Sequence, residues 1–198
     1  MFYNTAENRH GLSHDPFKAI VSPRPIGWIG SVSSSGAFNL APYSFFNAIC
    51  DTPKLVMFSS SGFKDSVRNI QETREFTCNL AGKHLTNQMN LTSAPAPHGA
   101  SEFELAGLTP VRGELVAAPY VGEAFAALEC RLTQFFQPDT LSGTPADNFV
   151  VIGEVVGIHI REEAVKNGRL DMATVRPLGR MGYMDYCDAG DVFEMLRP

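Results

Sequence analysis

The segment from residue 59 to residue 66 carries side chains that could bind an anion. It reads Ser59-Ser60-Ser61-Gly62-Phe63-Lys64-Asp65-Ser66. Apolar residues recur at helical spacing from Phe63 onward, so we predict an amphipathic helix from Lys64 to about Glu75. A helix start presents unpaired backbone N–H groups and a partial positive charge. A lysine at that place is therefore unfavourable unless an anion compensates it.

A phosphate is one such anion. It could accept hydrogen bonds from Lys64, from the serine hydroxyls and from the helix N–H groups together, and Ser66 in the first turn would add one more donor. Two alternatives to a phosphate stay open. Asp65 could neutralise Lys64, and serine-rich turns often cap helices without any ligand. This segment alone indicates either a phosphate site or a solvated cap.

A second polar and aromatic segment reads Asn39-Leu40-Ala41-Pro42-Tyr43-Ser44-Phe45-Phe46-Asn47. The Asn39 amide, in an otherwise apolar strand, needs both donors and acceptors, which the edge of a heteroaromatic ring can supply. Pro42 predicts an edge, a bulge or a bend in the strand. Phe45 is either a core residue or a stacking residue, and the lone Trp28 either walls a planar site or belongs to the core.

Several isolated residues have two interpretations each. Arg24 and Arg180 could contact an anion or be solvated loop arginines. His159 is either a hydrogen-bonded barrel residue or a proton donor. Glu129 and Glu154 lie in apolar strands, so we predict that they are hydrogen-bonded structural carboxylates.

Composition and missing motifs exclude several classes of protein. The net charge is −5 and the sixteen Lys and Arg are spread thinly, which argues against nucleic acid. The four cysteines form no Cys-x-x-Cys pair, so we expect no metal site. No apolar run approaches the roughly 20 residues of a membrane span, and the first residues lack a signal-peptide pattern. We therefore expect no membrane association and a cytoplasmic location. Rossmann, P-loop, hydrolase-elbow and zincin motifs are also missing from the sequence.

Closely spaced strand patterns surround the two polar segments. We predict strands at 26–32, 38–50, 55–60, 76–80, 127–136, 149–160 and 183–186. A turn at 33–36 should reverse the chain in a hairpin, a weak helix is expected at 83–91, and a Pro-rich loop at 93–99. Little helical sequence lies between consecutive strands, so antiparallel pairing is favoured. The prediction is one mostly β domain over residues 1–198, a small barrel with one or two helices outside.

Five blocks of the chain resemble the flavin reductase-like, FMN-binding split-barrel proteins, which include flavoredoxin and ferric reductase relatives. The blocks are VSPRPIGWIGSVSSSGAFNLAPYSFFNAI, SSSGFKDSVRNI, EFELAGLTP, LECRL and VVIGEVVGIHI. They fall in order between about Ala19 and Tyr183. The resemblance implies an antiparallel Greek-key split β-barrel with a few flanking helices, usually a homodimer, that holds FMN non-covalently near the subunit interface.

The resemblance also implies site residues. Asn39, Ala41, Pro42, Ser44 and Phe45 would line the ring and ribityl chain of FMN. The ribityl and phosphate end would be served by Ser59, Ser60, Lys64, Asp65 and Ser66. Trp28 and the turn from Arg180 to Tyr183 would flank the cofactor, with Arg24 a further candidate for contact with an anion.

The expected activity is that of an FMN-dependent oxidoreductase. It would take hydride from NAD(P)H and pass electrons to free flavin, a metal complex or a partner protein. Because the flavin carries the chemistry, no obligatory catalytic side chain is expected, with His159 as the one candidate. A non-catalytic FMN-binding electron carrier is the alternative that these motifs leave open.

Overall fold

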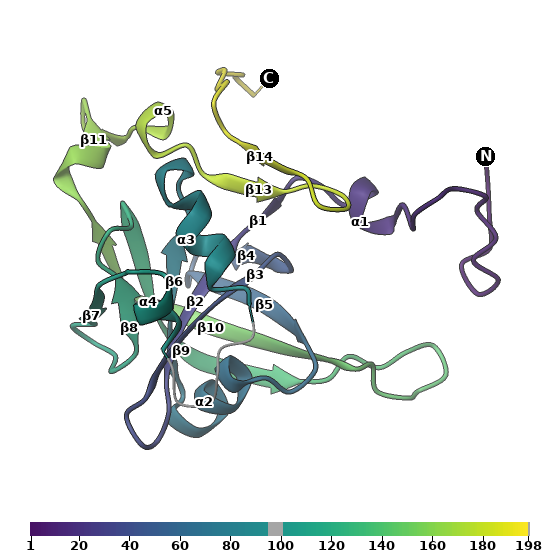
Figure 1. Ribbon diagram of the computed structural model, residues 1–198, viewed down its shortest axis with the longest axis horizontal. Helices are drawn as coiled ribbons and strands as arrows, with labels where there is room; N and C mark the ends of the chain where they lie inside the picture. The colour runs from purple at the N-terminus through teal and green to yellow at the C-terminus, as the bar shows by residue number, and fades with distance from the viewer. Residues whose placement is uncertain (95–100, 198) are drawn as a thin grey trace.

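Seven antiparallel strands form the main sheet (Figure 1). The computed structural model describes residues 1–94 and 101–197. Within them the sheet has the order β3-β2-β6-β9-β10-β5-β4. Its strands are β2 (Gly27–Val32), β3 (Phe38–Tyr43), β4 (Phe46–Cys50), β5 (Leu55–Ser61), β6 (Glu75–Leu80), β9 (Ala126–Phe136) and β10 (Asn148–Ile160). The sheet curls into a half-barrel, which confirms the predicted mostly β, antiparallel split barrel.

The two edge strands of this sheet, β3 and β4, are consecutive in the chain. Only Ser44 and Phe45 lie between them, so the Cα atoms of Tyr43 and Phe46 are at most about 11 Å apart. The opposite edges of the sheet therefore meet at this point. The single strand predicted over residues 38–50 is wrong in its middle, because the chain crosses from one edge to the other just after Pro42. Pro42 itself lies in the edge strand β3, where its missing N–H costs no ladder bond on the open side.

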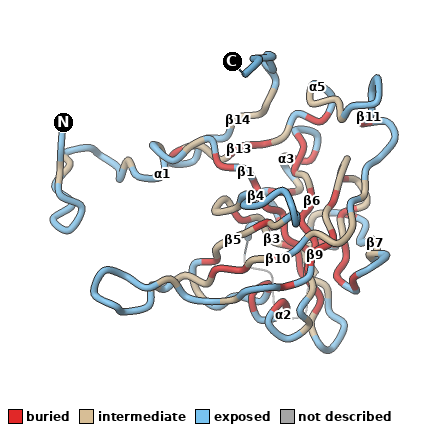
Figure 2. Tube along the Cα trace, turned by 180° about the vertical axis from the view of Figure 1, so that it is seen from behind, coloured by how far each residue is buried: buried red, intermediate tan, exposed pale blue. Residues whose placement is uncertain are grey.

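Strand β2 is buried on both faces, and this explains the position of Trp28. Successive side chains of a strand point to opposite faces, and all six residues of β2 are buried. Ile29 packs inside the barrel with Phe58 and Phe76. Trp28 packs on the other face, and its Nε1 donates to Thr92 Oγ1 at 2.8 Å. Figure 2 shows this buried interior beneath exposed loops.

Helices cover parts of the sheet. Their bounds are α1 (Phe17–Ile20), α2 (Asp65–Thr73), α3 (Thr86–Leu91), α4 (Glu102–Leu105) and α5 (Met172–Val175), with 3-10 turns at Lys83–Leu85 and Glu162–Ala164. The helix predicted after Ser61 is α2. It buries Val67 and Ile70 completely against the barrel. The weak helix predicted at 83–91 corresponds to a 3-10 turn followed by α3.

Short strands outside the main sheet complete the fold. They are β1 (Arg24–Pro25), β13 (Leu178–Arg180) and β14 (Tyr186–Asp188) in one small sheet, β7 (Pro110–Arg112) with β8 (Pro119–Val121), and β11 (Val165–Lys166) with β12 (Arg169–Leu170). The strand predicted at 183–186 is misplaced, because residues 183–185 belong to the turn after β13 and the last strand, β14, begins only at Tyr186. The loop predicted at 93–99 falls mostly on residues 95–100, outside the described part of the chain.

Candidate functional site

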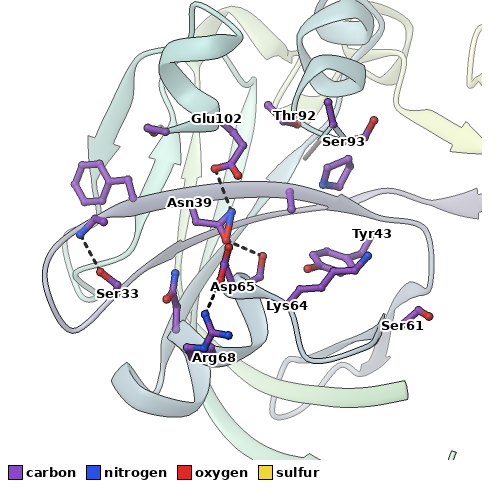
Figure 3. Close-up of a pocket in the computed structure, with 18 of the residues that line it drawn as sticks. Ser33, Asn39, Tyr43, Ser61, Lys64, Asp65, Arg68, Thr92, Ser93 and Glu102 are labelled. Atoms are coloured by element: carbon purple, nitrogen blue, oxygen red, sulfur yellow. Dashed lines mark hydrogen bonds and ion pairs between the residues drawn. The ribbon is translucent and has the colours of Figure 1, made fainter. Parts of the chain in front are cut away.

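A cavity of about 1250 Å³ lies between β3, the start of α2 and the segment around α4 (Figure 3). Its lining includes Ser44 and Phe45, where the chain crosses from β3 to β4, and Ser59 and Ser61 near the end of β5. The backbone N–H of Ser59 in β5 donates to the carbonyl of Phe45 at 2.8 Å, which joins the two segments. Nine of the residues predicted from the sequence line this main cavity: Asn39, Ala41, Pro42, Ser44, Phe45, Ser59, Lys64, Asp65 and Ser66. The fold thus brings both polar segments to one place.

The start of α2 forms a cationic wall of the main cavity. Lys64 is the N-cap residue, and the helix start has no side-chain cap hydrogen bond. Asp65 pairs with Arg68 at 2.7 Å, so Asp65 is engaged away from Lys64. Within residues 1–94 and 101–197, no carboxylate forms an ion pair with Lys64. Asp65 thus pairs with Arg68 rather than with Lys64, no side chain caps the helix, and Lys64 itself is exposed to solvent.

Asn39 lies at the centre of a hydrogen-bonded chain that crosses the cavity wall. Ser66 Oγ donates to Asn39 Oδ1 at 3.2 Å, and Asn39 Nδ2 donates to Glu102 Oε2 at 3.2 Å. The same carboxylate oxygen accepts from the backbone N–H of Leu40 at 3.1 Å. Figure 3 shows the Glu102 carboxylate pointing to Asn39 from one side, with Asp65 and Arg68 on the other side of Asn39. The amide is thus oriented by the protein, and the hydroxyl of Ser66 is directed to Asn39.

Tyr43 and Glu102 are members of this wall that the sequence reasoning missed. Tyr43 lines the cavity, and burial raises the pKa of its phenol, although hydrogen bonds with Ser66 and Ser60 oppose that shift. A buried, neutral phenol can donate a hydrogen bond to a ligand. Glu102 comes from α4, a helix that was not among the elements predicted from the sequence. No local pattern connects it with Asn39, 63 residues away.

Glu102→Ala should weaken the binding of a ligand in the main cavity. The substitution removes the acceptor of the Asn39 amide and of the Leu40 N–H, so Asn39 loses its fixed orientation. We expect a loss of about 1–2 kcal/mol, or roughly 5- to 30-fold in affinity. Fluorescence titration with FMN measures it.

The matched control for Glu102 is Glu104→Ala. Glu104 lies on the same short helix and also lines the main cavity, but its carboxylate accepts no hydrogen bond from the described residues. This variant should bind FMN normally. Equal affinity of both variants and the wild type would contradict the role of Glu102.

The other predicted site residues lie elsewhere. Arg24, Arg180 and Tyr183 line a second, adjoining cavity of about 380 Å³. Trp28 is fully buried in the core, so it does not face the main cavity. The hydroxyl of Ser60 is buried and donates to the carbonyl of Gly62 at 3.0 Å, which shapes the turn before α2. Trp28 and the turn from Arg180 to Tyr183 were predicted to flank the cofactor, and the fold places Arg180 and Tyr183 beside the main cavity and Trp28 behind it.

His159 belongs to a structural cluster outside both cavities. Its Nε2 lies 2.5 Å from Oε1 of Glu129, and its ring stacks on Tyr120 with centroids 4.3 Å apart. Glu129 is 1% exposed and also accepts from the backbone N–H groups of residues 114, 115 and 116 at 2.7–2.9 Å. Burial alone would raise the pKa of Glu129, but these hydrogen bonds outweigh it and lower the pKa. Glu129 is thus the structural carboxylate that was predicted, whereas Glu154 is exposed and the same prediction is wrong for it.

Residues 1–94 and 101–197 contain neither a metal centre nor a membrane span of the helical kind. No group of three or more His, Cys, Asp or Glu side chains is placed there to hold a metal ion. None of the helices in the same residues is long and apolar enough to cross a membrane.

Comparisons with known proteins show which family this chain matches. A family model described as "Flavin reductase like domain" matches residues 21–179. A protein of Aquifex aeolicus is 35% identical over 177 residues, covering 86% of each chain, and one of Deinococcus radiodurans is 37% identical over 192 residues, covering 90% of this chain and 82% of that protein. Both relatives are described only as uncharacterized.

Solved structures with the same fold carry functional descriptions. Nitrilotriacetate monooxygenase component B from Bacillus cereus superimposes with a TM-score of 0.88 at 31% identity, over 98% of each chain. The 2-nitrobenzoate 2-nitroreductase of Pseudomonas fluorescens gives a TM-score of 0.86 at 26% identity, over 100% of this chain and 96% of that one. Flavoredoxin of Desulfovibrio vulgaris gives 0.77 at 23% identity, over 87% and 90%, and shows the likeness of fold alone.

Proposed function

Because this chain belongs to the flavin reductase-like family, we propose that it is an oxidoreductase that binds FMN non-covalently in the main cavity and uses NADH or NADPH as its reductant. The family supports a flavin-related oxidoreductase in general. One observation supports FMN in particular as the ligand. The start of α2 has no side-chain cap, and Lys64 at this start has no carboxylate partner in the described residues. A phosphate fits this helix start, because it would accept hydrogen bonds from Lys64 and from the first backbone N–H groups of α2, which no side chain caps, while Asp65 in the first turn is paired with Arg68.

The rest of the cavity fits the remainder of FMN. Asn39, held by Glu102 and Ser66, offers an oriented amide to the edge of the ring. The crossing from β3 to β4 brings Ser44 and Phe45 to the lining of the main cavity, and the bond from Ser59 N–H to the carbonyl of Phe45 holds this crossing against β5. Bound FMN supplies hydride acceptance and onward electron transfer. The side chains of this protein bind and orient it, and no side chain is assigned a proton transfer.

Two of the structural neighbours point to different electron acceptors. One is named as a monooxygenase component and the other as a nitroreductase. We propose that the acceptor of this chain is of the same general kind: free flavin, a metal complex, a small oxidised molecule or a partner protein. We place the protein in the cytoplasm, as the sequence predicts.

Anaerobic reduction separates an enzyme from a passive carrier. The FMN-loaded protein is mixed with excess NADH, and separately with NADPH, in the absence of oxygen. We expect the visible flavin absorbance to bleach within seconds with at least one of them, much faster than free FMN under the same conditions, and to return on admission of air. Bleaching by dithionite but not by either nicotinamide would contradict the reductase and leave an electron carrier.

We also propose that the protein is a homodimer. The C-terminal segment extends from the body (Figure 1) and exposes four large apolar side chains, which are 61–83% accessible: Val192, Phe193, Met195 and Leu196. Exposed apolar groups of this size mark interaction surfaces. Light scattering on the eluted protein should give twice the 21.6 kDa chain mass, and Phe193→Asp should shift it toward the single-chain mass. A wild-type mass of one chain would contradict the dimer.

A further inference from the structure

The second cavity is cationic, and its described lining includes no carboxylate. Its charged members are Lys18, Arg24 and Arg180. The main cavity differs, because acidic side chains accompany the basic ones there. The two cavities adjoin: Lys18, Pro42, Ser44 and Ser93 line both of them. A ligand in one cavity is therefore next to a ligand in the other.

The sheet register places the two arginines directly opposite each other. Arg24 in β1 is the Cα partner of Arg180 in β13, next to α1 and β14 (Figure 1). Like charges at directly opposite positions of an antiparallel pair are destabilising. Within the described residues neither guanidinium forms an ion pair with a carboxylate. The fold thus gathers positive charge here without a carboxylate partner among the described residues.

Arg24 is a buried, hydrogen-bonded residue and not a solvated loop arginine. It is 6% exposed, and its Nη atoms donate to the carbonyls of Lys18, Val21 and Met181. Its Nε is buried and has no hydrogen-bond partner among the described residues. Burial first, and then the charge of Arg180, lower the pKa of Arg24. A buried cation with an unpaired donor indicates that a counter-charge belongs nearby.

Arg180 is the accessible member of the pair. One Nη donates to the carbonyl of Tyr183 at 2.6 Å, and the guanidinium lies over the Tyr186 ring, 4.4 Å from its centroid. Its exposure is intermediate. The rings of Tyr183 and Tyr186 line the same cavity and are themselves partly exposed, 48% and 36%. A guanidinium, a group suited to binding phosphate, therefore lies beside two partly exposed aromatic rings: it covers one face of Tyr186, and Tyr183 offers a further ring on which a base could stack.

We propose that the second cavity binds the pyrophosphate of the nicotinamide dinucleotide, with Arg180 as the main contact and Arg24 and Lys18 supplying further positive charge. This inference rests on the proposed function. FMN carries one phosphate, and the start of α2 accounts for it. The second cavity, with its three basic side chains, then fits a second anionic ligand next to the flavin. NADH and NADPH, the proposed reductants, both contain a pyrophosphate. Arg180 and Arg24 thus serve the dinucleotide rather than FMN, to which the sequence assigned them.

Calorimetric titration with adenosine 5′-diphosphate tests this without turnover. The probe carries the pyrophosphate and the base of the dinucleotide but no nicotinamide. The FMN-loaded wild type should bind it, Arg180→Gln should bind it at least 10-fold more weakly, and Arg180→Lys should fall between them. Arg169→Gln is the matched control, because Arg169 is exposed and lines neither cavity. FMN affinity should stay unchanged in Arg180→Gln, and the KM for the dinucleotide should rise with the loss of diphosphate binding.

Each remaining outcome is decisive. Equal binding of the probe by wild type and Arg180→Gln, or no binding by wild type that is loaded with FMN, overturns the inference and leaves the proposed function intact. Loss of FMN affinity in Arg180→Gln with normal binding of the probe assigns Arg180 to the FMN phosphate and also overturns it. A wild-type protein that does not bind FMN overturns the proposed function and this inference together. Arg180→Lys keeps the charge and the strand position, so the comparison holds even if Arg180→Gln does not fold.

Discussion

Lys64→Ala is expected to weaken FMN binding by about 10- to 100-fold and to leave riboflavin binding nearly unchanged. Riboflavin has the same ring and ribityl chain but no phosphate. Hydrogen bonds to charged groups contribute about 1.5–3 kcal/mol, and Lys64 has no carboxylate partner within the described residues. The difference between the two ligands therefore isolates the contact with the phosphate. Fluorescence titration of each variant with both ligands measures it.

Lys64 should be changed alone in this experiment, without Ser66. Ser66 is 1% exposed and its hydroxyl donates to Asn39, so Ser66→Ala would also disturb the amide beside the ring. Lys54→Ala is the matched control, because Lys54 pairs with Asp51 on the surface and lies outside the main cavity. Equal losses for FMN and riboflavin in Lys64→Ala would mean that the phosphate lies elsewhere.

Glu129→Ala should lower the free energy of unfolding by about 3–5 kcal/mol. The carboxylate is buried and accepts three backbone N–H groups at 2.7–2.9 Å in addition to its contact with His159. Each buried donor left without an acceptor costs about 1–3 kcal/mol, although water can satisfy part of the loss. For a chain of this length the melting temperature falls by roughly 2–4 °C per kcal/mol. Thermal and urea unfolding of the variant and the wild type measure this change in the free energy of unfolding.

The matched control for Glu129 is Glu154→Ala. Glu154 lies on the neighbouring strand β10 and is exposed, so its removal should change stability by less than about 0.5 kcal/mol. A similar small change for Glu129→Ala would contradict the structural role assigned to this carboxylate.

Acid should remove the same stabilisation in the wild type. The pKa of Glu129 is lower in the folded chain than its ordinary value. The group therefore stabilises the fold above the ordinary carboxyl pKa, and the stabilisation is lost as the pH falls through the folded pKa. Stability of the wild type should decrease more steeply in this acid range than that of Glu129→Gln. Parallel curves for the two proteins would mean that the carboxylate is not ionised in the fold.

Local patterns in the sequence predicted most strands and the main helix. The spacing of Phe63, Val67 and Ile70 identified α2, and the turn at 33–36 identified the hairpin of β2 and β3. Turn chemistry and periodicity are properties of neighbouring residues, so they are visible without the fold. The two polar segments were also found for this reason, since each is continuous in the chain.

Features that depend on pairing between distant segments were missed or misplaced. The break at Ser44 follows from which sheet edges meet, and no local pattern encodes it. The orientation of Trp28 could not be predicted because β2 is buried on both faces and shows no polar alternation. The contact of Glu102 with Asn39 and the opposition of Arg24 and Arg180 require the tertiary register. The two polar segments that line the main cavity were thus predictable, whereas the side chains that orient them and the second cavity were not.

The position of the FMN phosphate in a crystal structure of the FMN complex tests the proposed site most directly. The phosphate should lie at the start of α2, within hydrogen-bond distance of Lys64 Nζ and of the first backbone N–H groups of the helix, with the ring beside Asn39. A phosphate bound against Arg180 in the second cavity, or a flavin bound outside the main cavity, would contradict the proposed site.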